Sequence, residues 1–249
     1  MTLWRLEWLR LLRTRRLLVL VGVYTFFGLL GPLTARYLPQ IIERFGGEMT
    51  VIVPDPVPAD GMAQFGANAQ QVGLLVLVVI AAGALTFHAL PEMAIFLRTR
   101  ARSVGRLLVP RAAVTWCAAA IALVVGTAAA WYETAILLGT VPAGAVLAGT
   151  ALGLVYLAFV VGVVAAVAAR SPGLLATAAG SLIALLALPL LGLLSPVAPW
   201  LPSYLVGAPD ALVAGRTGFT EYLGAMAVSL AATAGLLALA ARMAGTREI

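Results

Sequence analysis

The chain has 249 residues, of which 62% are hydrophobic and only 10% are charged, whereas a soluble domain carries about a quarter charged residues. All sixteen basic residues are arginine, so the chain has no lysine for a phosphate-binding G-x-x-x-x-G-K-[ST] loop and cannot be a P-loop ATPase. The single cysteine, Cys117, excludes an intramolecular disulfide and argues against a cysteine-based metal cluster. The net charge of +6 comes from arginines beside apolar runs, which favours membrane topology over nucleic-acid binding.

Several apolar runs are about 20 residues long, enough for a helix to cross a hydrocarbon core about 30 Å thick. They predict an all-α membrane protein whose single transmembrane domain covers residues 1–249 and contains six transmembrane helices. The predicted spans are Leu17–Ala35, Gln70–Leu90, Ala112–Trp131, Gly144–Ala169, Gly173–Leu194 and Tyr222–Ala241.

Six spans place both chain ends on one side of the membrane, and the arginines indicate which side this is. Five precede the first span, five lie between the second and third, one lies between the fourth and fifth, and two are in the C-terminal tail. Because cytoplasmic connections are rich in basic residues, thirteen of sixteen on one side predict cytoplasmic termini. We expect a multi-pass protein of the bacterial inner (plasma) membrane.

The N-terminal segment, residues 1–16, is predicted to form an amphipathic helix in the membrane interface. Its apolar arc consists of Trp4, Trp8, Leu11 and Leu12. The opposite arc carries Arg10, Arg13 and Thr14. The alternative is a simple cytoplasmic extension of the first span.

Two proline-rich stretches lie on the predicted external side. Residues 36–69 are predicted to form a partly ordered external loop, because prolines and paired glycines interrupt regular structure. Residues 195–220 are too apolar for a solvated loop, which favours short re-entrant helices. The candidates for this external region are Pro196, Pro199, Trp200 and Pro202. The alternative is an interfacial loop anchored by Trp200 and Tyr204.

In the fourth span, Ala145, Gly149 and Gly153 recur every four residues. Such a stripe of small residues lets another helix approach closely. The partner could be a second copy of the chain or a neighbouring span of the same chain.

The sequence contains no clear catalytic constellation. A pair of Ser181 and His88 is formally conceivable, but a serine in an apolar helix commonly bonds the carbonyl four residues earlier. No H-E-x-x-H motif is present, and no span has an Asp or Glu near its centre, which disfavours metal hydrolysis and ion-driven transport. We therefore expect no catalytic residue, no metal and no cofactor bound by this chain, and an intramembrane hydrolase is only a remote alternative.

The connection between the second and third spans, residues 91–111, combines apolar and basic side chains. It is predicted to form an amphipathic helix that contacts lipid phosphates or an acidic partner. The candidates for such contacts are Glu92, Phe96, Arg98, Arg100, Arg102 and Arg106. The alternative is that these charges serve topology alone.

These features together resemble the permease subunits of type-2 ABC exporters (the ABC-2 family). Glu92 and Arg102 are similar to a glutamate and an arginine in the family's coupling loop, and Arg111 stands where the family has a lysine. The family's Gly-Thr pair and the proline before the arginine are absent here. The resemblance covers nearly the whole chain as architecture.

The resemblance implies a coupling helix in residues 91–111 and a permease pair, of two copies or paralogues, docked on two separate ABC ATPase subunits that hold ATP and Mg²⁺. Spans two and five would face a path for a hydrophobic or amphiphilic cargo. The alternative function is a membrane scaffold or regulatory subunit that transports nothing.

Overall fold

The structure is a computed structural model, and it describes residues 3–45, 55–86, 105–171, 173–193 and 196–246. The regular structure within these ranges is entirely helical. This agrees with the physical demand that a chain in lipid must pair its backbone N–H and C=O groups within each segment. The predicted all-α class is confirmed for this part of the chain.

Six helices or continuous helical runs are long and apolar enough to cross a membrane, as the sequence predicts. The second of these changes from α-helix to a π-turn and back. The six are α2 (Arg16–Phe45), the run α3–η1–α4 (Pro58–Asn68, Ala69–Gly73 and Leu74–Leu85), α6 (Gly105–Leu137), α7 (Ala143–Ala168), α8 (Leu174–Leu191) and α10 (Leu223–Thr246). The chain is therefore a multi-pass membrane protein.

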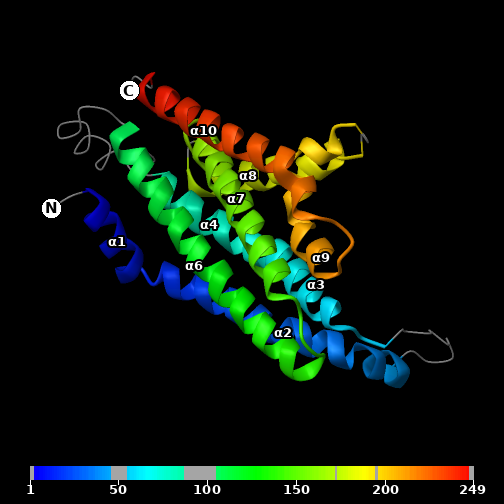
Figure 1. Cartoon of the computed structure of the whole chain (residues 1–249). Coiled ribbons are helices and arrows are strands. Elements are labelled where there is room, and N and C mark those ends of the chain that lie inside the picture. Colours follow the sequence, from blue (N-terminus) through cyan, green and yellow to red (C-terminus); the bar gives the residue numbers. More distant parts are fainter. Residues whose placement is uncertain (1–2, 46–54, 87–104, 172, 194–195, 247–249) are drawn as a thin grey trace.

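The bundle has two distinct ends, which we name after the short helices found there. At the α1 end, α1 (Leu3–Arg13) lies beside the start of α6, and the end of α10 is on the same side (Figure 1). At the opposite, α9 end, four short helices join α8 to α10. They are η3 (Ala198–Trp200), η4 (Pro202–Val206), α9 (Ala208–Val213) and η5 (Phe219–Tyr222).

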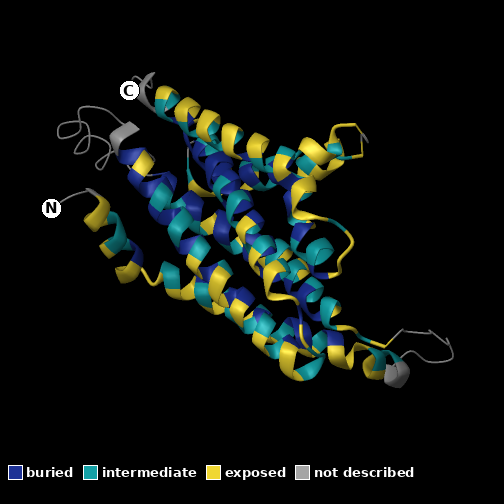
Figure 2. Ribbon diagram, viewed as in Figure 1, coloured by how far each residue is buried: buried dark blue, intermediate teal, exposed yellow. Residues whose placement is uncertain are grey.

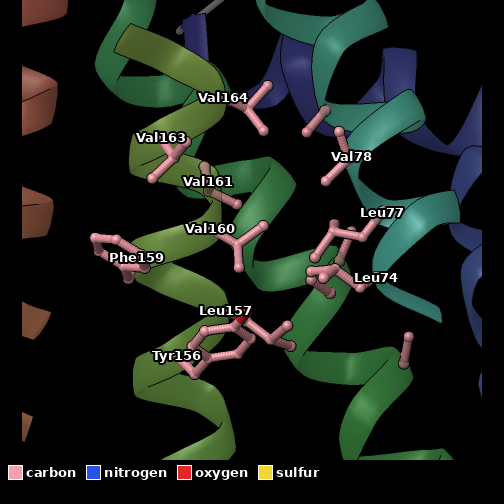
Figure 3. Packing of buried hydrophobic residues seen from close by; sticks show 14 of the residues in the cluster. Leu74, Leu77, Val78, Tyr156, Leu157, Phe159, Val160, Val161, Val163 and Val164 are labelled. Atoms are coloured by element: carbon pink, nitrogen blue, oxygen red, sulfur yellow. The ribbon is translucent and has the colours of Figure 1, made fainter. Parts of the chain in front are cut away.

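Helix α7 is the centre of the bundle. It packs against α4, α6, α8, α9 and α10, and 61% of its most apolar stretch is buried, compared with 17% for α10. Figure 2 shows the dark buried band along the middle of the bundle and exposed outer faces on α2 and α10. On α7, Val160 and Val164 point toward Leu77 and Val78 of α4, and all four are fully buried (Figure 3). A helix that is apolar on every face suits this central position.

Helices α2 and α6 approach each other closely because glycine replaces a larger side chain at the crossing. A Cβ atom on Gly126 would lie 2.8 Å from the carbonyl oxygen of Tyr24. On the other helix, Gly28 faces the backbone of Gly126 and Ala130 in the same way. Small residues at such crossings increase van der Waals contact between helices in lipid.

The small-residue stripe of the fourth span packs within the chain. A Cβ atom on Gly149 would lie 2.7 Å from Cα of Pro209 in α9, and one on Gly153 would lie 3.0 Å from the side chain of Leu123 in α6. Of the two partners that the sequence allows, the structure therefore supports neighbouring segments of the same chain.

The predicted external loop over residues 36–69 is wrong at both of its ends. Helix α2 continues to Phe45 with Pro39 inside it, and α3 begins at Pro58. Proline is favoured in the first turn of a helix, where its missing N–H costs nothing, and the carboxylate of Asp60 accepts a hydrogen bond of 2.8 Å from the N–H of Val57. Prolines that were interpreted as loop residues thus lie inside one helix and start the next.

The predicted connection over residues 91–111 is too long, because α6 begins at Gly105. Arg106 and Arg111 therefore belong to the third membrane helix. At its other end α6 extends to Leu137, six residues beyond the prediction, and the fourth, fifth and sixth spans agree with prediction within five residues at each end. Residues 87–104 lie outside the described residues.

We predict that Gly149→Ala lowers thermal stability, because its methyl group would meet the backbone of α9 and force the two helices apart. Overpacking of this kind costs about 1–3 kcal/mol, or a decrease in melting temperature of about 2–4 °C for each kcal/mol. The measurement is thermal unfolding of the purified protein in neutral detergent. Gly144→Ala is the matched control, because it lies on the same helix with nothing within 4 Å of its Cβ position; equal melting temperatures for both variants would contradict the prediction.

Candidate functional site

A cavity of about 80 Å³ lies inside the bundle. It is bordered by α2, the run α3–η1–α4, α6, α7, η4 and α9. Most of its wall is apolar, and no charged side chain among the described residues lines it. The polar side chains in the wall are Tyr24, Gln70, Thr127, Thr150 and Tyr156. An apolar pocket with a few converging polar groups is the usual form of a small-molecule site.

The cavity extends from the α9 end of the bundle to the middle of the membrane-spanning region. Tyr156 is thirteen residues from the start of α7 and twelve from its end, which is about 18–20 Å from each end at 1.5 Å per residue. Gln70 lies twelve residues after Pro58 and fifteen before Leu85 in its own run. These two side chains therefore place hydrogen-bonding groups at a depth where lipid offers none.

A π-turn positions Gln70. The segment η1, Ala69–Gly73, adds a wider turn between α3 and α4, and such π-turns occur frequently at functional sites. From this turn, Nε2 of Gln70 donates a hydrogen bond of 3.2 Å to the hydroxyl of Tyr156. The same turn ends at Gly73, where a Cβ atom would lie 2.8 Å from the ring of Tyr24.

The hydroxyl groups around the cavity are of two kinds, and both kinds also occur elsewhere in the spans, where those of Thr25 and Thr134 are buried without a partner in the described part of the chain. Thr150 donates to the carbonyl of Val146, four residues earlier. Many other span hydroxyls likewise donate to the carbonyl four residues before them, including those of Thr86, Ser181, Ser229 and Thr233. Such a bond satisfies the group locally. In contrast, the hydroxyls of Tyr24 and Thr127 have no hydrogen-bond partner within the described ranges. The cavity therefore has unused hydrogen-bonding capacity.

Asp210 lies at the α9 end of the cavity, beside the wall residues Pro209 and Gly66. One of its carboxylate oxygens is buried without a hydrogen-bond partner in the described part of the chain, and it lies 2.9 Å from the Cβ position of Gly66. Burial raises the pKa of the Asp210 carboxyl to about 6, and nearby Arg216 opposes this shift. Asp210 is thus a carboxyl group that can change protonation near neutral pH.

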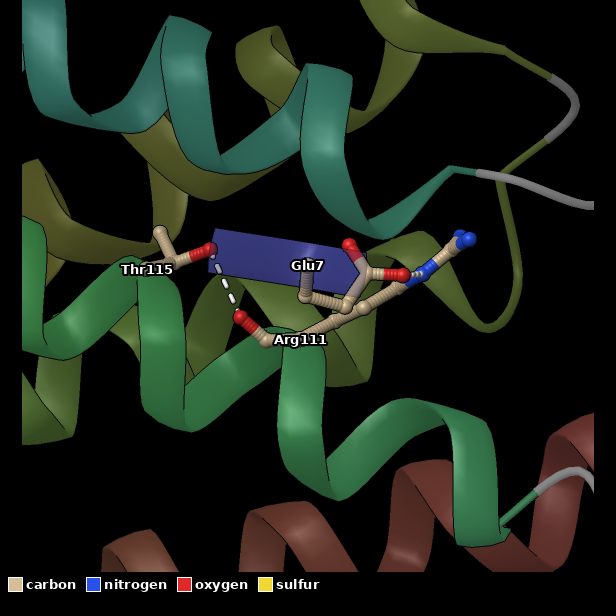
Figure 4. Close-up of polar contacts among 3 residues, drawn as sticks. All are labelled: Glu7, Arg111 and Thr115. Atoms are coloured by element: carbon tan, nitrogen blue, oxygen red, sulfur yellow. Dashed lines mark hydrogen bonds and ion pairs between the residues drawn. The ribbon is translucent and has the colours of Figure 1, made fainter. Parts of the chain in front are cut away.

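A buried ion pair lies at the α1 end. Nε of Arg111 in α6 donates to Oε1 of Glu7 in α1 at 2.7 Å, and the two side chains are 6% and 16% exposed. Figure 4 shows the pair together with Thr115, whose hydroxyl donates to the carbonyl of Arg111. Because a buried charge is costly without its partner, this pair fixes α1 against α6.

The predicted N-terminal helix is present as α1, but its faces differ from the prediction. Leu11 is buried and Trp8 is partly buried against the core, whereas Leu12 is 55% exposed. Trp4 and Arg13 are exposed and Arg10 is half-buried. The inward face therefore includes Glu7 with Trp8 and Leu11, because the ion pair with Arg111 rotates this side toward α6.

The predicted proline-rich region does contain short helices. Pro196, Pro199 and Trp200 are exposed, whereas Pro202 is buried at the start of η4. The ring of Trp200 lies over Gly224 of α10, 3.2 Å from its Cβ position. These residues border α10, and the following residues Leu205, Val206 and Pro209 form the wall of the cavity.

Most of the predicted coupling candidates lie outside the described residues. These are Glu92, Phe96, Arg98, Arg100 and Arg102. Arg106 is in the first turn of α6. His88 is also outside the described residues, and Ser181 donates to the carbonyl of Thr177 at 2.7 Å, as expected for a serine in an apolar helix.

Sequence reasoning missed Gln70, Tyr156, Asp210 and the Glu7–Arg111 pair. Two signals were visible. Glu7 interrupts the apolar arc of the N-terminal helix, so its carboxylate had to face a partner, and Tyr156 is a polar-tipped side chain near the centre of an apolar span. The contact between Gln70 and Tyr156 could not be predicted, because it depends on the π-turn.

Comparison with known proteins found no family model that matches this chain and no match among curated protein sequences. Within the described ranges, no group of three or more His, Cys, Asp or Glu residues is arranged to hold a metal ion.

We predict that the stability of the protein depends on the protonation of Asp210. Because its pKa is higher in the folded state than its usual 3.8, the folded state binds the proton more tightly, and stability decreases as pH rises from about 4 to about 6. At pH 7.5, Asp210→Asn should therefore melt at a higher temperature than the unmodified protein, by about 2–4 °C for each kcal/mol that ionisation costs. At pH 4.5, the two proteins should have similar melting temperatures. Asp55→Asn, at an exposed aspartate, is the control; a difference that does not change with pH would refute the prediction.

We predict that Glu7→Gln destabilises the protein by about 3 kcal/mol, because it removes the carboxylate that pairs with the buried charge of Arg111. The measurement is again thermal unfolding in detergent. Replacing both partners, Glu7→Leu with Arg111→Met, should recover much of the loss, since an apolar pair needs no charge compensation. Glu133→Gln changes a carboxylate of α6 that has no ion pair in the described structure, and a loss as large as that of Glu7→Gln would count against the role of the pair.

Proposed function

We propose that this chain is the membrane permease subunit of a type-2 ABC exporter and that it forms a path for a hydrophobic or amphiphilic cargo. Several features support the proposal: the six membrane-length helices, the N-terminal helix α1 packed at one end, and the short helices between the last two spans at the other end. The basic connection between the second and third spans completes the pattern.

The observation that carries the proposal is the cavity at mid-depth. A membrane scaffold gains nothing from a hollow with unpaired hydroxyls in its centre, because each such group costs free energy in a medium without water. A permease needs a place in the membrane where cargo can bind, and transporters commonly have such sites near the bilayer midplane. The cavity therefore favours a transport path over a scaffold.

The proposed orientation has the α1 end in the cytoplasm of a bacterial inner membrane. Thirteen of the sixteen arginines lie in the chain ends, the connections or the helix ends at this side, as the positive-inside rule requires. Helix α1 would then lie in the inner interface with Trp4 outward, and η3, η4 and α9 would be re-entrant helices of the outer half.

The energy would come from a separate ATPase, because the chain lacks the lysine of a P-loop. In this proposal the ATPase docks on residues 91–104, with Glu92, Phe96, Arg98, Arg100 and Arg102 as contacts and Arg106 beside them. The Glu7–Arg111 pair joins α1 to the start of α6, so a displacement of the docking segment would act on both helices.

The proposed complex contains two permease chains, as two copies or as paralogues. Helices α4 and α8, the second and fifth spans, pack side by side, so one face of the bundle could present both to a second chain. Large apolar side chains are exposed along α8, including Leu175, Ile183, Leu186 and Leu190.

The test is purification of the tagged full-length chain from native membranes, with co-purified ABC ATPase identified by mass spectrometry. We expect the ATPase with the unmodified chain and about tenfold less with Arg100→Glu combined with Arg102→Glu, because reversed charges repel an acidic docking surface. The unmodified chain and this double variant should insert into the membrane in equal amounts.

The matched control combines Arg36→Glu with Arg216→Glu, which reverses two exposed arginines at the proposed outer side and should leave the co-purified ATPase unchanged. Absence of an ABC ATPase from the unmodified preparation, or equal loss in both double variants, would refute the proposal. ATP-dependent transport in inverted vesicles separates the permease from a scaffold that merely binds the ATPase.

A further inference from the structure

The mid-depth cavity is selective against charge. Among the described residues its wall contains no Arg, Asp, Glu or His; Asp210 lies beside the wall residue Gly66 but is not part of the wall. Burying an ion without a partner of opposite charge costs far more than burying a neutral polar group. A ligand that enters fully must therefore present an uncharged group.

The paired side chains of Gln70 and Tyr156 define what this group can be. Because Nε2 of Gln70 donates to the Tyr156 hydroxyl, the tyrosine proton is left to donate elsewhere, and Oε1 of Gln70 is left to accept. The pair thus offers one donor and one acceptor side by side. The hydroxyls of Tyr24 and Thr127, which also line the cavity, add further capacity. A hydroxyl group, which both donates and accepts, satisfies such a pair.

The size of the cavity sets the third condition. An engineered protein cavity of about 150 Å³ holds benzene, and a single water needs about 10–15 Å³. A cavity of about 80 Å³ therefore accepts a small polar group with a few carbon atoms but no drug-sized molecule. The rest of a larger ligand has to lie along the apolar wall and outside the cavity.

We propose that this cavity binds the uncharged, hydroxyl-bearing end of an amphiphilic molecule, with Gln70 and Tyr156 as the residues that recognise the hydroxyl group. The inference rests on the proposed function, because the molecule it names is the class of cargo that the permease would carry. It places the recognition site inside one bundle, beneath η4 and α9. In this arrangement Pro209 of α9 packs on Gly149 of α7 and closes the site at the α9 end.

The experiment uses the purified full-length chain in lipid nanodiscs, without any ATPase. Three photoreactive probes carry the same ten-carbon chain with a diazirine beside the head group, which is a primary alcohol, a carboxylate or a trimethylammonium. After irradiation at pH 8, mass spectrometry locates the labelled peptides. We expect the alcohol to label cavity-lining segments around Gln70 and Tyr156, unlabelled decanol to compete, and the two charged probes to label these segments weakly.

Variants test the recognising pair. Gln70→Leu and Tyr156→Phe should each reduce labelling of the cavity by the alcohol probe about fivefold to tenfold, the effect of losing one buried hydrogen bond. The matched controls Gln71→Leu and Tyr132→Phe make the same changes at exposed positions and should label like the unmodified chain. Thr127→Val, which keeps the side-chain shape, provides a further cavity variant if Gln70→Leu fails to fold.

Equal labelling of these segments by the three probes, or labelling that the cavity variants leave unchanged, would overturn the inference. This outcome differs from failure of the proposed function. A chain that labels as expected but recruits no ABC ATPase keeps its ligand site and loses its assignment as a permease, whereas a chain that recruits the ATPase but fails the labelling test loses only the site.

Discussion

The structure depends on one constraint, which is that polar groups in lipid must find their partners inside the protein. The backbone meets it by forming helices, and many span hydroxyls meet it by bonding the carbonyl four residues earlier, as Ser181 and Ser229 do. Groups that do not follow this pattern are therefore informative. Around the cavity, Tyr24 and Thr127 have no partner within the described ranges, and Gln70 and Tyr156 satisfy each other only in part. The hydroxyls of Thr25 and Thr134 are also buried without a described partner but do not line the cavity, so it is the combination of unpaired groups with a hollow that indicates where a ligand can bind.

Electrostatics at the two ends of the bundle obey this constraint in different ways. At the α1 end, Arg111 enters the third membrane helix with its charge balanced by Glu7, so the charge is retained and two helices are held together. At the α9 end, Asp210 forms no ion pair within the described residues, and burial raises its pKa to about 6; here the charge itself is disfavoured. One end is therefore fixed by an ion pair, whereas the other contains a carboxyl group whose ionisation weakens the packing of α9 beside Gly66.

The sequence was sufficient to predict six spans because each requires only a long apolar run, a local property. It failed where the outcome depended on neighbours or on position within a turn. Pro39 and Pro58 were interpreted as loop residues, yet Pro39 lies inside α2 and Pro58 starts α3. The position of Pro58 is explained by the compatibility of proline with a first helical turn. The cavity was not predictable at all. Its polar groups come from α2, η1, α6 and α7, and no periodicity within one span indicates that they converge.

Helix α6 connects the two regions that the proposed function requires. It carries Arg111 near the α1 end and Thr127 in the wall of the cavity, sixteen residues and about 24 Å further along the same helix. Its contact with α2 is close enough that Gly126 tolerates no side chain beside Tyr24, and Tyr24 is itself part of the cavity wall. A shift of α6 at its Arg111 end would therefore have to move α2 with it or break their contact. Both a joint movement of α2 and α6 and a loss of their contact would change the shape of the cavity. In the proposed function, force applied at the α1 end would therefore reach the ligand site through α6 itself and would not need the loops.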